Sequence, residues 1–318
     1  MAQRPPIKIG LIGLGKMGQN HLRVLILLKS VELVFVYDLN EEAAKQLGEK
    51  YGVQTHADLE QLMPQVDAVV ICTPTVTHGD YIRLAARYVK HIFVEKPMTD
   101  SFQESQALSS FALENNLRIQ VGFIERFNPA VQQLKSILDK SAQVISIDFM
   151  RTNKLSARIT DVDVVTDLMI HDIDLALFFN GPVSSVSAHG VAQGQMIDFA
   201  SALLTHQNGR FSRIQASRIT EKKIRTIQAT CIDMYVDCEL VRKELLINRQ
   251  SEIKQEDEGP YIISAIEQTI EVRQQEALLT ELQSFVDFCQ DQDVEVPMAA
   301  DGLSAADICD KIQKAVRQ

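Results

Sequence analysis

Short apolar runs alternate with amphipathic segments through the first third of the chain. Strands are predicted where apolar residues form nearly continuous runs, at "IKIGLIG", "ELVFVYD", "DAVVICTP", "HIFVEKP" and "RIQVGF". Helices are predicted between these runs, over residues 18–29, 40–52, 77–89 and 100–116. Because strands and helices alternate at this length, the pattern favours a doubly wound parallel sheet.

The pattern changes after about Gly122. A helix is predicted at "NPAVQQLKSILD" and a very apolar one at "DLMIHDIDLALFF"; closely spaced strand-like runs follow, separated by turn signals such as Asn208-Gly209. Strands this close together predict a large open, mostly antiparallel sheet. "SEIKQEDEGP" is predicted to be a charged loop, and helices near 273–290 and 302–317 end the chain. The fold class is therefore α/β, with domains over residues 1–122 and 123–318. Whether the last helix packs back on the first domain stays open.

Composition and charge argue against several classes of partner. The 318 residues are 46% hydrophobic and 23% charged, as in an ordinary globular protein, and carry a formal net charge of −10. This charge and the lack of a Lys/Arg-rich run argue against binding to nucleic acid or anionic membranes. The five cysteines form no C-x-x-C pair, which is typical of reduced thiols. No signal-peptide pattern is found and the apolar runs are too short to span a membrane, so we expect a cytoplasmic protein.

A glycine-rich loop joins the first predicted strand to the first predicted helix. Gly13, Gly15 and Gly18 fit G-x-G-x-x-G in the strand–turn–helix context that a dinucleotide-binding loop requires. The first glycine permits the tight turn, the second lets a pyrophosphate approach, and the third allows close helix–strand packing. Lys16 and Met17 open the helix, whose free N–H groups favour a phosphate. We expect a nucleotide-binding Rossmann domain, although glycines also occur in purely structural turns.

Asp38 ends the second predicted strand, 25 positions after Gly13. A carboxylate there can accept hydrogen bonds from the adenosine ribose hydroxyls and would repel a 2′-phosphate. No Arg follows within the next few residues to hold such a phosphate. The sequence therefore favours NAD over NADP, while a simple capping role for Asp38 before Asn40 is the alternative.

Several other polar residues follow predicted strands directly. Thr73-Pro74 follows the third strand, and Glu95-Lys96-Pro97 follows the fourth. Because ligands of open α/β sheets bind beyond the carboxyl ends of the strands, we expect both segments to lie on the cofactor edge. This topology predicts Lys96 beside a bound nicotinamide. A charged strand end before a turn is the alternative.

The apolar helix "DLMIHDIDLALFF" carries ionisable residues. Asp167, His171 and Asp174 stand at i, i+4 and i+7, which places them on one stripe of a regular helix. Ionisable groups on so apolar a helix need partners or a chemical role, and a His beside a carboxylate can exchange a proton near neutral pH. A satisfied buried pair is the alternative. A metal site is not predicted, because no further ligands with a recognisable spacing appear.

Together these motifs resemble the Gfo/Idh/MocA family of oxidoreductases. The glycine motif, "TPTVTH" at 73–78, "EKP" at 95–97 and D-x-x-x-H-D-x-D at 167–174 occur over essentially the whole chain. The resemblance implies NAD-dependent oxidation of a sugar or cyclitol hydroxyl, with a C-terminal sheet that joins subunits into a homodimer or homotetramer. It places Lys96, Asp167 and His171 at the catalytic and substrate positions. It places Thr73, Pro74, His78, Glu95 and Lys96 at the cofactor, and it leaves a cis Lys96–Pro97 peptide bond open.

A narrower resemblance is carried by "VGFIERFNPAV" at 121–131. It is similar to UDP-N-acetylglucosamine 3-dehydrogenases, whose 3-keto product an aminotransferase then uses in an amino-sugar pathway such as lipopolysaccharide or lipid A biosynthesis. Arg126 and Asn128 are candidate substrate contacts, with a salt bridge and a helix cap as the alternatives. Arg151 and Arg158 are candidates for a substrate diphosphate, because guanidinium groups suit that geometry.

Other functions stay open at this point. The substrate could be another sugar or a cyclitol such as inositol or a glucose-type sugar, and some family members cleave glycosides through a transient ketone. A non-catalytic NAD-sensing protein is a further alternative, against which the intact Lys96, Asp167 and His171 argue. The proton acceptor is either Lys96 or His171.

Overall fold

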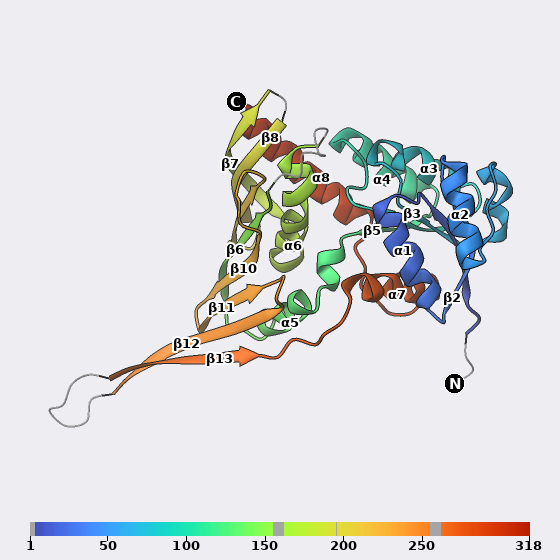
Figure 1. Ribbon diagram of the computed structural model, residues 1–318. Coiled ribbons are helices and arrows are strands. Elements are labelled where there is room, and N and C mark those ends of the chain that lie inside the picture. The colour runs from blue at the N-terminus through green and yellow to red at the C-terminus, as the bar shows by residue number, and fades with distance from the viewer. Residues whose placement is uncertain (1–3, 155–161, 195, 255–261) are drawn as a thin grey trace. The chain divides into compact units, whose positions relative to one another are not determined.

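The computed structural model describes residues 4–154, 162–194, 196–254 and 262–318 (Figure 1). Contacts divide the chain into two compact units: Met1–Ile124 with Glu276–Asp307, and Glu125–Gln275 with Ile308–Gln318. Sequence alone assigns residues 276–307 to the second domain, whereas contacts group them with the first unit. The helix α8 spans Ala299–Arg317, and the division falls within it.

The first unit is built on a five-stranded sheet with the order β2-β1-β3-β4-β5, in which every pairing is parallel. Its strands are β1 (Ile7–Ile12), β2 (Val31–Tyr37), β3 (Ala68–Ile71), β4 (His91–Glu95) and β5 (Arg118–Gly122). Its helices, apart from α8, are α1 (Lys16–Leu27), α2 (Glu41–Tyr51), α3 (His78–Ala85), α4 (Phe102–Glu114) and α7 (Ala277–Cys289). The predicted doubly wound parallel sheet is therefore confirmed.

Apolar burial explains why α7 belongs to this unit. Leu282 and Phe285 of α7 are fully buried in one hydrophobic cluster with Leu22 and Leu25 of α1 and with residues of β1, β3 and β4. A helix with such an apolar face is stabilised only where a matching surface covers it. The α1 face of the parallel sheet supplies that surface, although α7 comes more than a hundred residues later in the chain.

The second unit is built on an eight-stranded sheet with the order β13-β12-β11-β10-β6-β9-β8-β7. Its strands are β6 (Val144–Thr152), β7 (Val183–Gln193), β8 (Met196–His206), β9 (Phe211–Ser217), β10 (Ile224–Cys231), β11 (Met234–Glu239), β12 (Glu244–Lys254) and β13 (Ile262–Ile270). Among the described strands of this sheet, only β6 and β9 pair in parallel, so the predicted open, mostly antiparallel sheet is confirmed. The helices α5 (Pro129–Leu138) and α6 (Ile170–Asn180) lie on one face of this sheet (Figure 1).

The predicted charged loop at 251–260 is partly wrong. β12 continues to Lys254, and β13, which the sequence pattern does not reveal, pairs with it from Ile262 onward. The two strands extend as a hairpin beyond the rest of the sheet (Figure 1). Backbone pairing with the neighbouring strand forms this hairpin, so the apolar periodicity of the segment is a poor guide to it.

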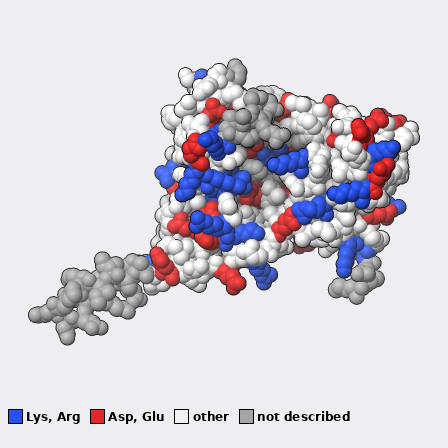
Figure 2. All heavy atoms as spheres, in the orientation of Figure 1, with Lys and Arg blue, Asp and Glu red and all other residues white. Residues whose placement is uncertain are grey.

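Charge and hydropathy complete the description of the chain. In the part of the chain that the structure describes, no helix is both long enough and apolar enough to cross a membrane. Lys and Arg side chains are interspersed with Asp and Glu side chains on the face seen in Figure 2.

Candidate active site

The glycine loop between β1 and α1 has three glycines with different physical roles. Gly13 has a φ of +93°, and a Cβ there would lie 2.6 Å from the backbone carbon of Cys72. A Cβ on Gly18 would lie 1.9 Å from the carbonyl oxygen of Gly13. A Cβ on Gly15 would meet no atom within 4 Å. The first and third glycines are therefore required by the fold, whereas the second leaves open space where a ligand can approach.

Open space at Gly15 continues into a cavity of about 450 Å³. The loops after β1, β2 and β3 line it, with Gly13, Gly15, Asp38, Thr73 and Pro74 among the lining residues. Lys16 and Met17 are exposed in the first turn of α1, and the helix has no side-chain cap. Uncapped N–H groups beside a cavity suit a phosphate, and five of the eleven predicted cofactor residues line this cavity.

The Asp38 carboxylate is fixed at this cavity by backbone hydrogen bonds. Its Oδ2 accepts from the N–H of Leu14 at 2.7 Å and its Oδ1 accepts from the N–H of Asn40 at 2.9 Å. Glu41 and Glu42 follow and line a neighbouring cavity together with Asp38. Lys45 lines the same cavity, so three carboxylates face one lysine. This excess of negative charge disfavours an additional phosphate on the ribose, which supports the predicted preference for NAD.

The segment with Lys96 directly follows β4. Lys96 is partly buried, and its peptide bond to Pro97 is cis. His78 was expected at the cofactor, but its ring nitrogens instead lie 3.0 Å from the carbonyl oxygen of Pro97 and 2.9 Å from that of Thr73. Burial lowers the pKa of His78, although these backbone contacts act in the opposite direction. His78 therefore joins the loop after β3 to the Lys96 segment and does not line the cavity.

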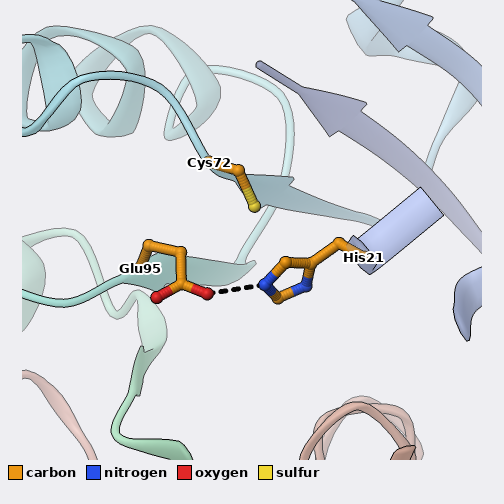
Figure 3. A group of neighbouring side chains, drawn as sticks. All are labelled: His21, Cys72 and Glu95. Atoms are coloured by element: carbon orange, nitrogen blue, oxygen red, sulfur yellow. Dashed lines mark hydrogen bonds and ion pairs between the residues drawn. The ribbon is translucent and has the colours of Figure 1, made fainter. Parts of the chain in front are cut away.

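Glu95 was also expected at the cofactor, and it instead faces inward. Figure 3 shows Glu95 at the end of β4, His21 on α1 and Cys72 after β3 pointing toward one another. Their potential ligand atoms all lie within 4.8 Å of one another, as a metal site would require. However, Glu95 Oε1 and His21 Nε2 are only 2.6 Å apart, whereas two ligand atoms on one tetrahedral zinc lie about 3.3 Å apart. Burial also raises the pKa of the Cys72 thiol well above its usual value, so the geometry fits a hydrogen bond better than a shared ion.

In the second unit, the predicted continuous α-helix around Asp167 is wrong in one respect. Residues Val165–Met169 form a π-helical turn that runs into α6 at Ile170. The carboxylate of Asp163 accepts from the N–H groups of Val165 and Thr166, at 3.1 Å and 3.0 Å, and so caps this turn. Asp167 lies on the π turn and His171 in the first turn of α6, so the i, i+4 spacing does not mark one regular stripe. Such π turns occur frequently at functional sites.

Arg218 holds the Asp167 carboxylate, and sequence patterns gave no sign of this. Its Nη2 donates to Asp167 Oδ2 and to the carbonyl oxygen of Asp163, both at 3.1 Å, and its Nη1 donates to the carbonyl oxygen of Val162. The Arg218 side chain is 2% exposed, whereas that of Asp167 is 29% exposed. The buried guanidinium therefore orients a carboxylate that is itself accessible. Arg218 follows the end of β9 and belongs to no recognisable motif.

Arg126 and Asp174 form a buried ion pair. Arg126 Nε and Nη2 donate to the two oxygens of Asp174 at 2.9 Å and 2.6 Å. The side chains are 7% and 1% exposed. The salt bridge, named above as the alternative to substrate contact, is what the structure shows for Arg126, and Asp174 is its partner.

Arg151 also forms buried ion pairs, in this case with two carboxylates. Its guanidinium donates to both oxygens of Asp172, at 2.9 Å and 2.8 Å, and to Glu125 at 2.8 Å. Burial raises the pKa of Asp172 despite Arg151, whereas in Glu125 burial is outweighed by Arg151 and the pKa is lowered. Because these two carboxylates engage a fully buried guanidinium, Arg151 does not present it to a substrate diphosphate.

The two remaining candidates for substrate contact are Asn128 and Arg158. Asn128 caps α5, since its Oδ1 accepts from the N–H of Ala130 at 3.1 Å and its Nδ2 donates to Glu125. The helix-cap alternative therefore describes Asn128. Arg158 lies outside the described residues.

Comparison with protein-family models finds two matches in order along the chain. Residues 7–123 match the model described as an oxidoreductase family with an NAD-binding Rossmann fold. Residues 148–232 match the model described as a GFO/IDH/MocA C-terminal domain. The matches cover the parallel sheet with its glycine loop and, in the second sheet, most of β6 and the strands β7 to β10.

Individual relatives are similar over most of their length. The UDP-N-acetylglucosamine 3-dehydrogenase of Acidithiobacillus ferrooxidans is 30% identical over 283 residues, which cover 88% of each chain. A solved structure of that enzyme matches 98% of each chain with a TM-score of 0.88 and 26% identity. The NAD(+)-dependent scyllo-inositol 2-dehydrogenase of Bacillus subtilis is 34% identical over 232 residues, 67% of each chain. A levoglucosan dehydrogenase solved with NADH and levoglucosan, at 20% identity and a TM-score of 0.82, shares the fold.

Proposed function

Because the chain belongs to the Gfo/Idh/MocA oxidoreductase family and carries its NAD-binding Rossmann domain, we propose that it oxidises a nucleotide sugar, namely C3 of UDP-N-acetylglucosamine. The observation that carries this substrate is the similarity to the Acidithiobacillus enzyme, which extends over 88% of both sequences and 98% of both structures. The product would be a 3-keto sugar nucleotide.

The proton chemistry falls to residues of this chain. When bound, NAD supplies the hydride acceptor, so the protein has to remove the hydroxyl proton. Lys96 and His171 are the candidate bases, and Asp167, held by Arg218, orients His171 or accepts a hydrogen bond from a sugar hydroxyl. Lys96, Asp167 and His171 are assigned to these roles by their family motifs. Asp38 supports NAD over NADP. Backbone N–H groups hold both oxygens of its carboxylate at the cavity, where the carboxylate can accept from ribose hydroxyls and repel a 2′-phosphate.

The wider setting follows from the proposed reaction. A 3-keto sugar nucleotide is a substrate for an aminotransferase, so we infer that such an enzyme consumes the product in an amino-sugar pathway such as lipopolysaccharide or lipid A biosynthesis. A nucleotide sugar and NAD are both cytoplasmic metabolites, which supports a cytoplasmic location. The open eight-stranded sheet supports assembly into a homodimer or homotetramer.

A cyclitol dehydrogenase is the second candidate. The Bacillus subtilis scyllo-inositol 2-dehydrogenase has the higher identity, 34%, although only over 67% of each chain. The two candidates predict different substrates for the same hydride and proton transfer, so one assay separates them.

The assay follows the absorbance of reduced nicotinamide after NAD is mixed with the protein and a substrate. We expect turnover with UDP-N-acetylglucosamine and little with scyllo-inositol, myo-inositol or glucose 6-phosphate. Turnover only with a cyclitol would overturn the nucleotide-sugar substrate, and NAD binding without turnover of any of them would indicate a binding protein. Lys96→Met should lower kcat about 100-fold or more, as loss of a general base does. Lys314→Met is the matched control: the Lys314 side chain is 63% exposed, and the variant should keep wild-type kcat.

A further inference from the structure

A buried histidine lies directly behind the Lys96 segment. The side chain of His21, on α1, is 0% exposed, and its Nε2 lies 2.6 Å from Oε1 of Glu95. Since the Glu95 carboxylate can only accept, the Nε2–H of His21 donates, and the contact is a short, charge-assisted hydrogen bond. Figure 3 shows the two side chains pointing at each other from α1 and the end of β4.

The second oxygen of the same carboxylate reaches Lys96. Glu95 Oε2 accepts from the backbone N–H of Lys96 at 3.2 Å. One carboxylate therefore links a histidine in the core to the peptide group that begins Lys96. Gly122 of β5 leaves room for the Glu95 carboxylate. A Cβ on Gly122 would lie 3.1 Å from Glu95 Oε2 and 3.0 Å from the Phe93 ring.

The surroundings of His21 restrict its ring. Its imidazole packs edge-to-face on Phe93 with ring centroids 5.3 Å apart, and Phe93 packs in the same way on Phe285 of α7. Among the described residues, Cys72 lies beside this pair, and Glu281 interacts electrostatically with Cys72. Burial, with Glu95 and Glu281 adding to it, raises the pKa of Cys72, so the thiol stays neutral. The His21 ring is thus fixed by aromatic packing and directs its N–H at Glu95.

We propose that His21 is a positioning residue which, through Glu95, fixes the peptide group of Lys96 and thereby sets the direction in which the Lys96 side chain leaves the end of β4. The catalytic consequence rests on the role proposed above for Lys96. The tether itself does not, since it consists only of the contacts among His21, Glu95 and Lys96. A proton-transfer group has to be held within a few tenths of an ångström of its productive position, and a tether from the core supplies that restraint.

The first readout of the test needs no substrate. Hydrogen–deuterium exchange is measured on peptides that contain the Lys96 amide, in wild type, His21→Leu and His21→Gln. Leucine keeps the apolar packing but removes the donor, so the Lys96 amide should exchange at least tenfold faster. Glutamine keeps an N–H donor and should restore most of the protection. Equal exchange in all three proteins would overturn the proposal whatever the enzyme's substrate is.

The second readout is kinetic. With whichever substrate gives turnover, His21→Leu should lower kcat about tenfold, with the Kd for NAD within twofold of wild type, and His21→Gln should recover kcat. His206→Gln is the matched control: this buried histidine contacts the Gly181 carbonyl and Ser212, so its loss should lower the melting temperature but leave kcat unchanged.

The outcomes separate the tether from the enzymatic function. Faster amide exchange with an unchanged kcat in His21→Leu would overturn the positioning role. Faster exchange in a protein that oxidises no sugar or cyclitol would leave the tether standing and refute the proposed function. Loss of kcat together with an equal loss of NAD affinity would mean that His21 only supports the fold of the nucleotide site, which also overturns the proposal.

Discussion

Alanine substitutions at Gly18 and Gly15 test two different requirements on the glycine loop. Gly18 tests close packing, and Gly15 tests the space needed for a ligand to approach. In Gly18→Ala, the new Cβ would lie 1.9 Å from the carbonyl oxygen of Gly13, far inside van der Waals contact. In Gly15→Ala, the new Cβ meets no protein atom within 4 Å, and the φ of −62° is one that alanine adopts readily. The two substitutions therefore add the same methyl group to a crowded and to an open position.

The expected loss of stability follows from these contacts. Overpacking costs about 1–3 kcal/mol, and the upper end applies to Gly18 because the opposing atom belongs to the backbone. Alanine gains about 1 kcal/mol over glycine in a helix, which leaves a net loss of about 2 kcal/mol for Gly18→Ala. At about 2–4 °C per kcal/mol, the melting temperature should fall by about 4–8 °C. Gly15 is the N-cap of α1, where alanine costs about 1 kcal/mol or less, so the second variant should melt within about 4 °C of wild type.

For NAD binding we expect Gly15→Ala, rather than Gly18→Ala, to have the larger effect. The Cβ of Gly15→Ala occupies the space through which a pyrophosphate would approach the N-terminus of α1. Losing one hydrogen bond to a charged group costs about 1.5–3 kcal/mol, which corresponds to a rise in Kd of about 10- to 150-fold. Calorimetric melting without ligand and isothermal titration with NAD measure both quantities on the same samples.

Either half of this contrast can refute the reasoning. Wild-type NAD affinity in Gly15→Ala would show that the pyrophosphate does not pass over Gly15. A wild-type melting temperature in Gly18→Ala would show that the loop packs less tightly against α1 than the 1.9 Å approach implies.

Three further predictions concern other parts of the molecule. Asp38→Ala should weaken NAD binding about tenfold, by about one hydrogen bond, and weaken NADP binding less, as initial rates with both cofactors would show; an unchanged ratio would contradict the ribose role. Arg218→Met should lower kcat at least tenfold without changing the KM for NAD, because the Asp167 carboxylate loses the group that orients it; unchanged kcat would place Asp167 outside the reaction. Burial lowers the pKa of His78, His91 and His206 below 6.5, so the unfolded chain binds more protons just below that pH. Thermal stability should therefore fall as pH drops below about 6.5, and glutamine at all three positions should flatten this dependence.

The parallel sheet and the nucleotide loop could be predicted because their signals are local. Buried parallel strands are continuous apolar runs, and the alternation of such runs with helices along the chain indicates a parallel sheet. The roles of Gly13, Gly15 and Gly18 follow from spacing within one strand–turn–helix unit. Each of these features depends on residues close together in sequence, so periodicity and spacing suffice.

Other features could not be predicted, because they depend on partners that are distant in sequence. β13 is held by pairing with β12, and the π turn before α6 is capped by Asp163, whose other oxygen accepts from Gln313 and Arg317 at the end of the chain. Arg126 and Arg151 have the residue type that a diphosphate prefers, and only the positions of Asp174 and Asp172 show that carboxylates already engage them. Residue type alone cannot separate an arginine that binds a ligand from one that balances a buried acid.

The proposed catalytic groups are also held by residues that are distant in sequence. Glu95, beside Lys96, is tethered to His21, 74 positions earlier, and Asp167 is held by Arg218, 51 positions later. In both cases the supporting residue is buried while the proposed catalytic group is partly accessible. A side chain that must meet a substrate cannot be fixed by apolar packing on all sides, so its direction has to come from hydrogen bonds at its base. Motifs therefore identify the residues that would touch the substrate, whereas the residues that orient them can be found only in the folded chain.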